Sequence, residues 1–110
     1  MINSDTDKFS PLRKGLLEYA VLSIVSKQKV YAADILDALS KTEFATGEGT
    51  LYPLLSRLRR DELVAYEWVE SEAGPPRKYY GLTAEGNARL SELRAYWQQL
   101  QKTIQQLGAK

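Results

Sequence analysis

The sequence predicts a mainly helical fold with one two-stranded β-hairpin. Apolar residues recur at helical spacing in four segments, and an aromatic-rich, strand-like segment separates the third segment from the fourth. A Gly-Pro-Pro turn at residues 74–76 divides the strand-like segment into two halves. The predicted order is therefore helix, helix, helix, hairpin, helix, and a chain of 110 residues is expected to form one compact unit.

Composition excludes several classes of function. The chain has no cysteine and no histidine, which removes disulfides, the usual zinc sites and any Ser-His or Cys-His nucleophile pair. We therefore expect no catalytic residues, no metal ligands and no cofactor. No long apolar run or leader-like start is present, so we expect a cytoplasmic protein without a membrane segment. The net charge of +1 does not by itself favour nucleic acid.

The first two helices are predicted from their start signals and apolar spacing. Ser10 and Pro11 form an N-cap and first-turn pair, so the first helix is expected over residues 11–26. Its apolar residues occupy more than one face, which suggests that a partner subunit covers the second face. The second helix is expected over residues 30–41.

The third helix, over residues 47–60, has one apolar stripe and one exposed face. Leu51, Leu55 and Leu58 share the stripe. The opposite face and its edges carry hydroxyl and guanidinium groups that can contact phosphates or base edges, on Thr50, Tyr52, Ser56, Arg57, Arg59 and Arg60. Pro53 lies inside the helix and should bend it. Read alone, the segment also fits an ordinary amphipathic surface helix.

The aromatic-rich segment predicts a hairpin over residues 65–82 with a long tip. Arg77 and Lys78 follow the prolines of the turn, so we expect them near that tip. There they either contact phosphate or are simply solvated. Acidic residues slightly outnumber basic ones between residues 47 and 80, so folding must gather the cations on one surface if the protein binds DNA.

The last helix is predicted to begin with Thr83 as its N-cap and to end at Gly108 as its C-cap. Apolar residues at spacings of three and four form a seam too short for a free-standing coiled coil. We expect the seam to be a dimer interface that includes Leu93, Trp97, Leu100 and Ile104. The unit then divides into residues 10–83, a winged helix-turn-helix DNA-binding domain, and residues 84–108, a C-terminal dimerisation helix.

Three motifs in this order resemble the PadR family of bacterial transcriptional regulators. They are LRKGLLEYAVLSI at residues 12–24, EGTLYPLLSRL at residues 48–58 and GPPRKYYGLTAEG at residues 74–86. The short last helix resembles the compact subfamily. The resemblance implies a homodimeric winged-helix repressor whose C-terminal helices form the dimer. In some relatives a flat aromatic ligand binds between two tryptophans at the dimer centre, and Trp97 lies where that tryptophan would fall.

The sequence thus predicts a DNA-binding transcriptional regulator that acts as a homodimeric repressor on double-stranded DNA and is released by a planar aromatic molecule. The residues expected to contact DNA are Thr50, Tyr52, Ser56, Arg57, Arg60, Arg77 and Lys78, and the residue expected to contact the ligand is Trp97. The alternative is a winged-helix protein-interaction module that does not bind DNA, which the near-neutral charge favours.

Overall fold

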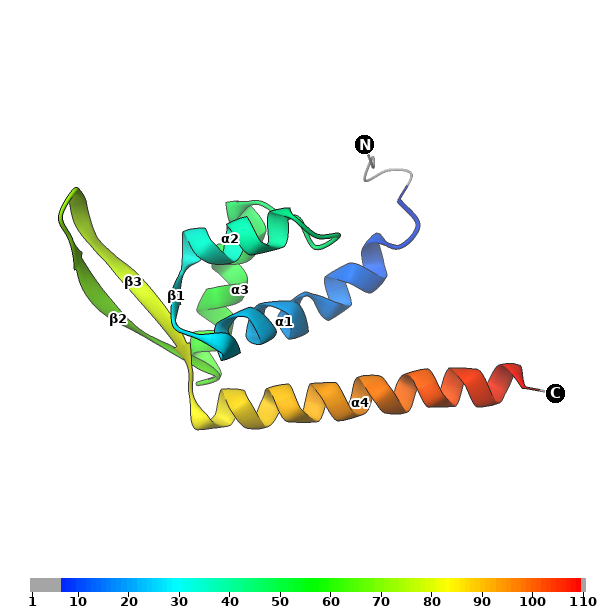
Figure 1. Ribbon diagram of the computed structural model, residues 1–110. Coiled ribbons are helices and arrows are strands. Elements are labelled where there is room, and N and C mark those ends of the chain that lie inside the picture. The colour runs from blue at the N-terminus through cyan, green and yellow to red at the C-terminus, as the bar shows by residue number, and fades with distance from the viewer. Residues whose placement is uncertain (1–6, 110) are drawn as a thin grey trace.

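The computed structural model describes residues 7–109 and has the predicted winged helix-turn-helix layout (Figure 1). The elements, in chain order, are α1 (Ser10–Lys27), β1 (Val30–Tyr31), α2 (Ala32–Ser40), α3 (Glu48–Arg60), β2 (Val64–Ser71), β3 (Gly74–Leu82) and α4 (Ala84–Gly108). The β2–β3 hairpin projects from one end of the helical body as the wing, and α4 runs alongside α1 and past it.

The core lies between α1, α2, α3 and the base of the sheet. The predicted stripe of α3 is fully buried at Leu51, Leu55 and Leu58. It packs in one cluster with side chains from every other element, including Val21, Leu22, Val25, Ile35, Leu39, Val64, Tyr80 and Leu90. The core thus fixes which face of α3 points outward.

A short strand, β1, was missed by the sequence analysis. Val30 and Tyr31 pair antiparallel with Tyr80 and Tyr79, which gives a three-stranded sheet of order β1-β3-β2. The second helix therefore begins at Ala32 and not at residue 30. Two residues are too few to show a strand period, and their apolar character merges with that of the helix that follows.

The prediction of a long hairpin tip was wrong. Ser71 pairs with Gly74, so only Glu72 and Ala73 form the tip. Both prolines of the turn lie inside β3, whose neighbour β1 is paired only with Tyr79 and Tyr80. A strand edge without a partner tolerates proline because no ladder hydrogen bond is lost there.

Helix boundaries are close to those predicted, with two corrections at the caps. Ser10 is the first residue of α1, and Phe9 occupies the N-cap position without a side-chain cap bond. Gly108 is the last residue of α4, and Ala109 is its C-cap. Thr83 is the N-cap of α4 as predicted and accepts a hydrogen bond of 2.9 Å from the Gly86 amide. Helix α3 continues unbroken through Pro53.

Helix α4 is the longest element of the described chain, and its far end and the wing lie at opposite ends of a molecule that extends over 61 Å (Figure 1). Its first half packs against the core at Leu90, while its second half extends past the helical body (Figure 1). None of the helices in residues 7–109 is long and apolar enough to span a membrane.

Candidate nucleic-acid interface

The outward face of α3 forms an exposed ridge. We define the ridge by Gly49, Pro53, Ser56 and Arg60, all of which are exposed. Pro53 and Arg60 line the grooves on both sides of α3, so they mark the middle of the ridge. The predicted face is therefore accessible along the whole helix, because the opposite stripe is held in the core.

Two adjoining hollows separate the ridge from the wing. The wing groove, about 450 Å³, is lined from α3 by Ser56, Arg59 and Arg60 and from the sheet by Tyr66, Lys78 and Tyr80. The wing cleft, about 330 Å³, lies next to it and includes Tyr31, Tyr52, Trp68, Arg77 and Lys78. Five predicted DNA contacts thus gather around these hollows: Tyr52, Ser56, Arg60, Arg77 and Lys78.

Aromatic rings lie on both faces of this sheet. The Tyr66 ring lies 5.6 Å from that of Tyr80, its partner across the strands, and 5.9 Å from that of Trp68 in an edge-to-face arrangement. Near β1, on the opposite face by strand alternation, the rings of Tyr31 and Tyr79 are 4.9 Å apart. Such ring pairs add about 0.5–1.5 kcal/mol each beyond their buried area, so they stiffen the base of the wing.

Each cation of the wing rests on one or more of these rings. The Arg77 guanidinium lies 3.9 Å from the centroid of the Tyr31 ring. The Lys78 ammonium lies 4.5 Å from the Tyr66 centroid and 5.6 Å from the Trp68 centroid. Ring faces attract cations without carrying a formal charge. Both cations are therefore positioned while their charges remain available to an anion.

Burial raises the pKa of the Tyr80 phenol above its usual value of 10.0. Neighbouring Tyr66 and Tyr52 raise that pKa further, and Arg59 opposes them. The Arg59 guanidinium itself lies 4.8 Å from the centroid of the Tyr66 ring. At neutral pH, Tyr80 is accordingly an uncharged hydroxyl beside the wing groove.

The other side of α3 differs in its chemistry. There, between α1 and the ridge, the α1 groove of about 540 Å³ is lined by Thr50, Arg57, Lys14 and Glu18, among others. Arg57 is held by carboxylates, at 3.1 Å from Glu18 and 3.8 Å from Asp61. Thr50 and Arg57 therefore lie on the α1 side of the ridge, and Arg60 lines the same groove from the ridge itself.

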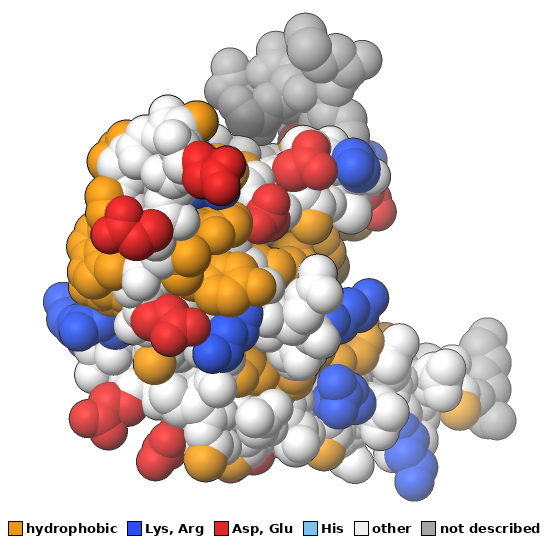
Figure 2. Space-filling model, turned by 60° about the vertical axis from the view of Figure 1, so that its left-hand side comes forward, with side chains coloured by type: hydrophobic (Ala, Val, Ile, Leu, Met, Phe, Trp, Pro, Cys, Tyr) orange, Lys and Arg blue, Asp and Glu red, His pale blue; other side chains and the backbone are white. Residues whose placement is uncertain are grey.

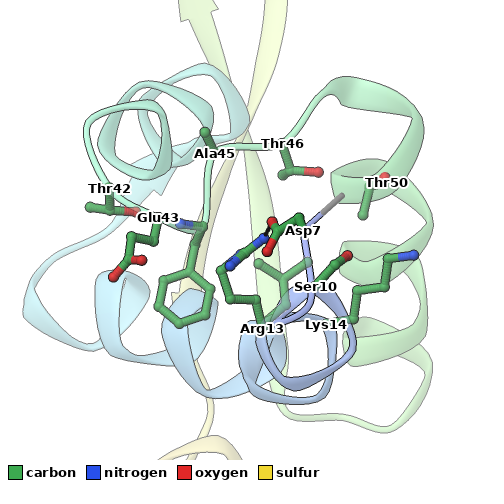
Figure 3. Close-up of a pocket in the computed structure, with 11 residues that line it drawn as sticks. Asp7, Ser10, Arg13, Lys14, Thr42, Glu43, Ala45, Thr46 and Thr50 are labelled. Carbon is green, nitrogen blue, oxygen red and sulfur yellow. Dashed lines mark hydrogen bonds and ion pairs between the residues drawn. The ribbon is translucent and has the colours of Figure 1, made fainter. Parts of the chain in front are cut away.

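A further depression lies between the start of α1 and the connection from α2 to α3 (Figure 3). Its volume is about 410 Å³, and its walls mix acidic, basic and hydroxyl side chains. Arg13 points into it and forms an ion pair with Asp7. That ion pair neutralises the guanidinium of Arg13, and the depression shares Lys14 and Thr50 with the α1 groove.

The charged surface is mixed. Figure 2 shows a broad area of hydrophobic side chains with both basic and acidic side chains around it. No large field of one sign appears on this face, which agrees with the net charge of +1. Any attraction for DNA must therefore come from individual cations placed near the ridge.

Comparison with known proteins identifies the family. A family model described as the transcriptional regulator PadR-like family matches residues 21–92. The chain belongs to the PadR family. A PadR-like transcription factor from Bacteroides fragilis is 48% identical with a TM-score of 0.81, covering 90% of this chain and 96% of that chain.

Other relatives agree with this assignment. A PadR-like transcriptional regulator from Bacillus cereus is 34% identical with a TM-score of 0.80, covering 92% of this chain and 100% of that chain. A transcriptional regulator of Mycobacterium tuberculosis is 31% identical over 92 residues, which is 84% of this chain and 85% of the relative. The protein is thus a PadR-family transcriptional regulator with a winged-helix DNA-binding fold, and not an enzyme.

Sequence analysis missed several residues of this PadR-family surface. Tyr31, Tyr66 and Trp68 support the wing cations, and Glu18 holds Arg57 from another helix. Because side chains alternate along a strand, the sequence could have placed Lys78 on the same face as Tyr66 and Trp68. Neither the partner of Arg57 nor that of Arg77 has such a signal, because both depend on how separate elements pack.

The predicted dimer and ligand residues lie along α4, where Leu93 also lines the α1 groove. Leu93 packs partly against the core, and Trp97 is half-buried. Leu100 is exposed, and Ile104 has 66% of its surface in contact with solvent. In the single chain these residues form one continuous apolar strip on α4.

Proposed function

We infer that this PadR-family regulator is a repressor that binds operator DNA as a homodimer, with the α3 ridge in the major groove and the wing along the adjacent backbone. The observation that supports it most is the set of wing cations fixed on aromatic rings beside an open helix face. Fixed cations bind phosphate with little loss of side-chain entropy, and an exposed helix can reach base edges.

Each predicted contact has a role in this proposal. Tyr52 and Ser56 read bases from the wing side of the ridge, and Thr50 and Arg57 read them from the α1 side. Arg60, in the last turn of α3, contacts the backbone, and Arg77 and Lys78 contact phosphates beside the wing cleft. Hydroxyl groups and arginine suit both kinds of contact.

The DNA experiment measures affinity for a fragment from upstream of the protein's own gene by fluorescence anisotropy over a range of salt concentrations. Arg77→Ala and Lys78→Ala should each weaken binding to all sequences and reduce the salt slope by about one unit. Lys102→Ala, which removes an exposed cation from α4, is the matched control and should leave the slope unchanged.

The same assay tests the ridge. Tyr52→Ala combined with Arg57→Ala should reduce the preference for the upstream fragment over a mixed-sequence duplex, because base contacts specify and phosphate contacts do not. A double variant that keeps the full preference, with an unchanged melting temperature, would show that the base-reading residues beside the ridge are misassigned.

A protein-interaction module is the competing function, and the mixed surface charge favours it. The two functions differ in their response to salt. DNA binding weakens steeply as salt rises because bound counterions are released, whereas apolar docking does not. If the protein does not bind the upstream fragment even at low salt, the protein-interaction module is favoured.

We also propose that Trp97 and its symmetry mate enclose a planar aromatic effector at the dimer centre. The support is the half-buried indole in an otherwise aliphatic strip, together with the family resemblance. The test is a fluorescence titration with planar dyes and phenolic acids, in Trp68→Phe protein and in protein that carries both Trp68→Phe and Trp97→Phe. Quenching should occur only in the first, and its absence there across the panel would leave the strip as packing alone.

A further inference from the structure

Glu18 of α1 lies between two arginines from two different helices. One carboxylate oxygen, Oε1, is 3.1 Å from a guanidinium nitrogen of Arg57 on α3. The other, Oε2, is 3.1 Å from a guanidinium nitrogen of Arg89 on α4. The Arg89 contact is also a hydrogen bond that Arg89 donates. A single side chain thus connects α3, which we call the recognition helix because it is proposed to read base edges, to the C-terminal helix α4.

The Glu18 carboxylate is well shielded, while its partners are not. Its side chain is 17% exposed, against 46% for Arg57 and 42% for Arg89. Asp61, one turn further along α3, is the other carboxylate near Arg57, at 3.8 Å. Glu18 is therefore the closest fixed negative charge to Arg57, and its low exposure reduces screening of the attraction by solvent.

The two arginines share one negative charge. While the Arg57 guanidinium pairs with Glu18, its attraction for DNA is partly cancelled. Arg89 draws on the same carboxylate, so its presence reduces the net negative potential at Arg57. Arg89 precedes Leu90, which is buried against the core, so its position follows that of α4.

We propose that Glu18 competes with DNA for Arg57, and that Arg89 weakens this competition by engaging the second carboxylate oxygen. Loss of the Arg89 contact leaves the carboxylate to Arg57 and lowers DNA affinity. Glu18 is in this way a positioning residue that transmits the state of α4 to the recognition helix. The inference rests on the proposed DNA binding.

The proposal fixes the sign of each substitution. Glu18→Gln keeps the shape of the side chain but removes its charge, so DNA affinity should rise by about two- to fivefold, the range typical of exposed ion pairs. The salt slope should steepen, because the surface that faces DNA loses one negative charge. If Glu18 only holds the helices together, Glu18→Gln should instead lower DNA affinity.

Arg89→Gln tests the contact between Arg89 and Glu18 without altering Glu18 or Arg57. It should weaken DNA binding by about twofold in otherwise unchanged protein. In the Glu18→Gln background it should weaken binding no more than Lys102→Ala does, because no carboxylate remains to compete for. Arg57→Gln should abolish the gain produced by Glu18→Gln.

The experiment uses the full chain with two probes, the upstream fragment and a mixed-sequence duplex. Glu92→Gln is the matched control, since it removes the same charge from an exposed position of α4. Melting temperature and sedimentation establish that each variant keeps its fold and assembly. If Glu18→Gln does not fold, Arg89→Gln alone still tests the link to α4, because a folded variant with unchanged affinity overturns it.

The outcomes separate the two proposals. If the unaltered protein binds neither probe at low salt, the proposed function fails and this inference fails with it. If it binds but folded Glu18→Gln binds equally or more weakly, the competition is overturned while DNA binding stands. An unchanged affinity in folded Arg89→Gln likewise overturns the link to α4.

Discussion

The two halves of α4 share one sequence pattern but have different surroundings. In the first half, Gly86 and Leu90 are buried against the chain's own core. In the second half, Leu100, Ile104 and Leu107 are 36%, 66% and 81% exposed. The apolar spacing is the same in both halves. The pattern therefore predicts which face of the helix is apolar, but it does not predict what packs against that face.

The difference follows from helix length. At about 1.5 Å per residue, the 25 residues of α4 extend over roughly 37 Å, whereas the 18 residues of α1 beside it extend over roughly 27 Å. The helical body therefore ends before α4 does (Figure 1). The comparison predicts that substitutions in the first half damage the fold, while those in the second half affect assembly.

The largest effect is expected for Gly86→Ala. A Cβ atom at Gly86 would lie 1.9 Å from the backbone oxygen of Leu63, and a backbone atom cannot swing aside as a side chain can. We expect a loss of about 4 kcal/mol or more in the free energy of unfolding, measured by urea denaturation. Gly108→Ala is the control, because nothing lies within 4 Å of its added Cβ. A stable Gly86→Ala protein would mean that α4 docks less tightly than described.

Leu90→Ala comes next. Leu90 is 4% exposed and belongs to the core cluster, so its truncation should cost about 2–4 kcal/mol through lost burial and a residual cavity. Leu107→Ala, made in the exposed half, should cost no more than about 0.5 kcal/mol in the unfolding of the single chain. Equal costs at the two positions would contradict the division of α4.

The outcome of the sequence analysis follows the same division. Elements with many periodic residues, such as α3 and its buried stripe at Leu51, Leu55 and Leu58, could be predicted from the sequence. Two-residue β1 and the short tip at Glu72 could not, since pairing with a distant strand determines them. For the site, the exposed ridge was predictable, whereas the ring beneath Arg77 and the carboxylate beside Arg57 depend on packing between separate elements.

Thr83→Ala should have a smaller effect, at the junction of the wing with α4. The Thr83 hydroxyl accepts from the Gly86 amide at 2.9 Å and donates to the Glu62 carbonyl at 2.6 Å. Loss of an N-cap costs about 1–2 kcal/mol, which urea denaturation can resolve. Thr83→Ser retains the hydroxyl and should recover most of the loss. If it recovers none, the methyl group and not the cap stabilises this junction.

The smallest effect on the fold of the single chain is expected for Ile104→Asp, although its effect on assembly should be the largest of all. Ile104 is 66% exposed, so a charge there disturbs little within the chain, and the unfolding free energy of the dissociated chain should change by about 0.5 kcal/mol or less.

In the proposed dimer the same carboxylate enters an apolar contact beside a second copy of itself, and an unpaired buried charge is costly. Sedimentation at micromolar concentration should show a dimer for the unaltered protein and a monomer for Ile104→Asp. Gln98→Asp introduces the same charge on the opposite face by helical spacing and should leave the dimer intact. If unaltered protein sediments as a folded monomer, the exposed strip has no second copy to cover it, and the two halves of α4 differ only in their contacts with the core.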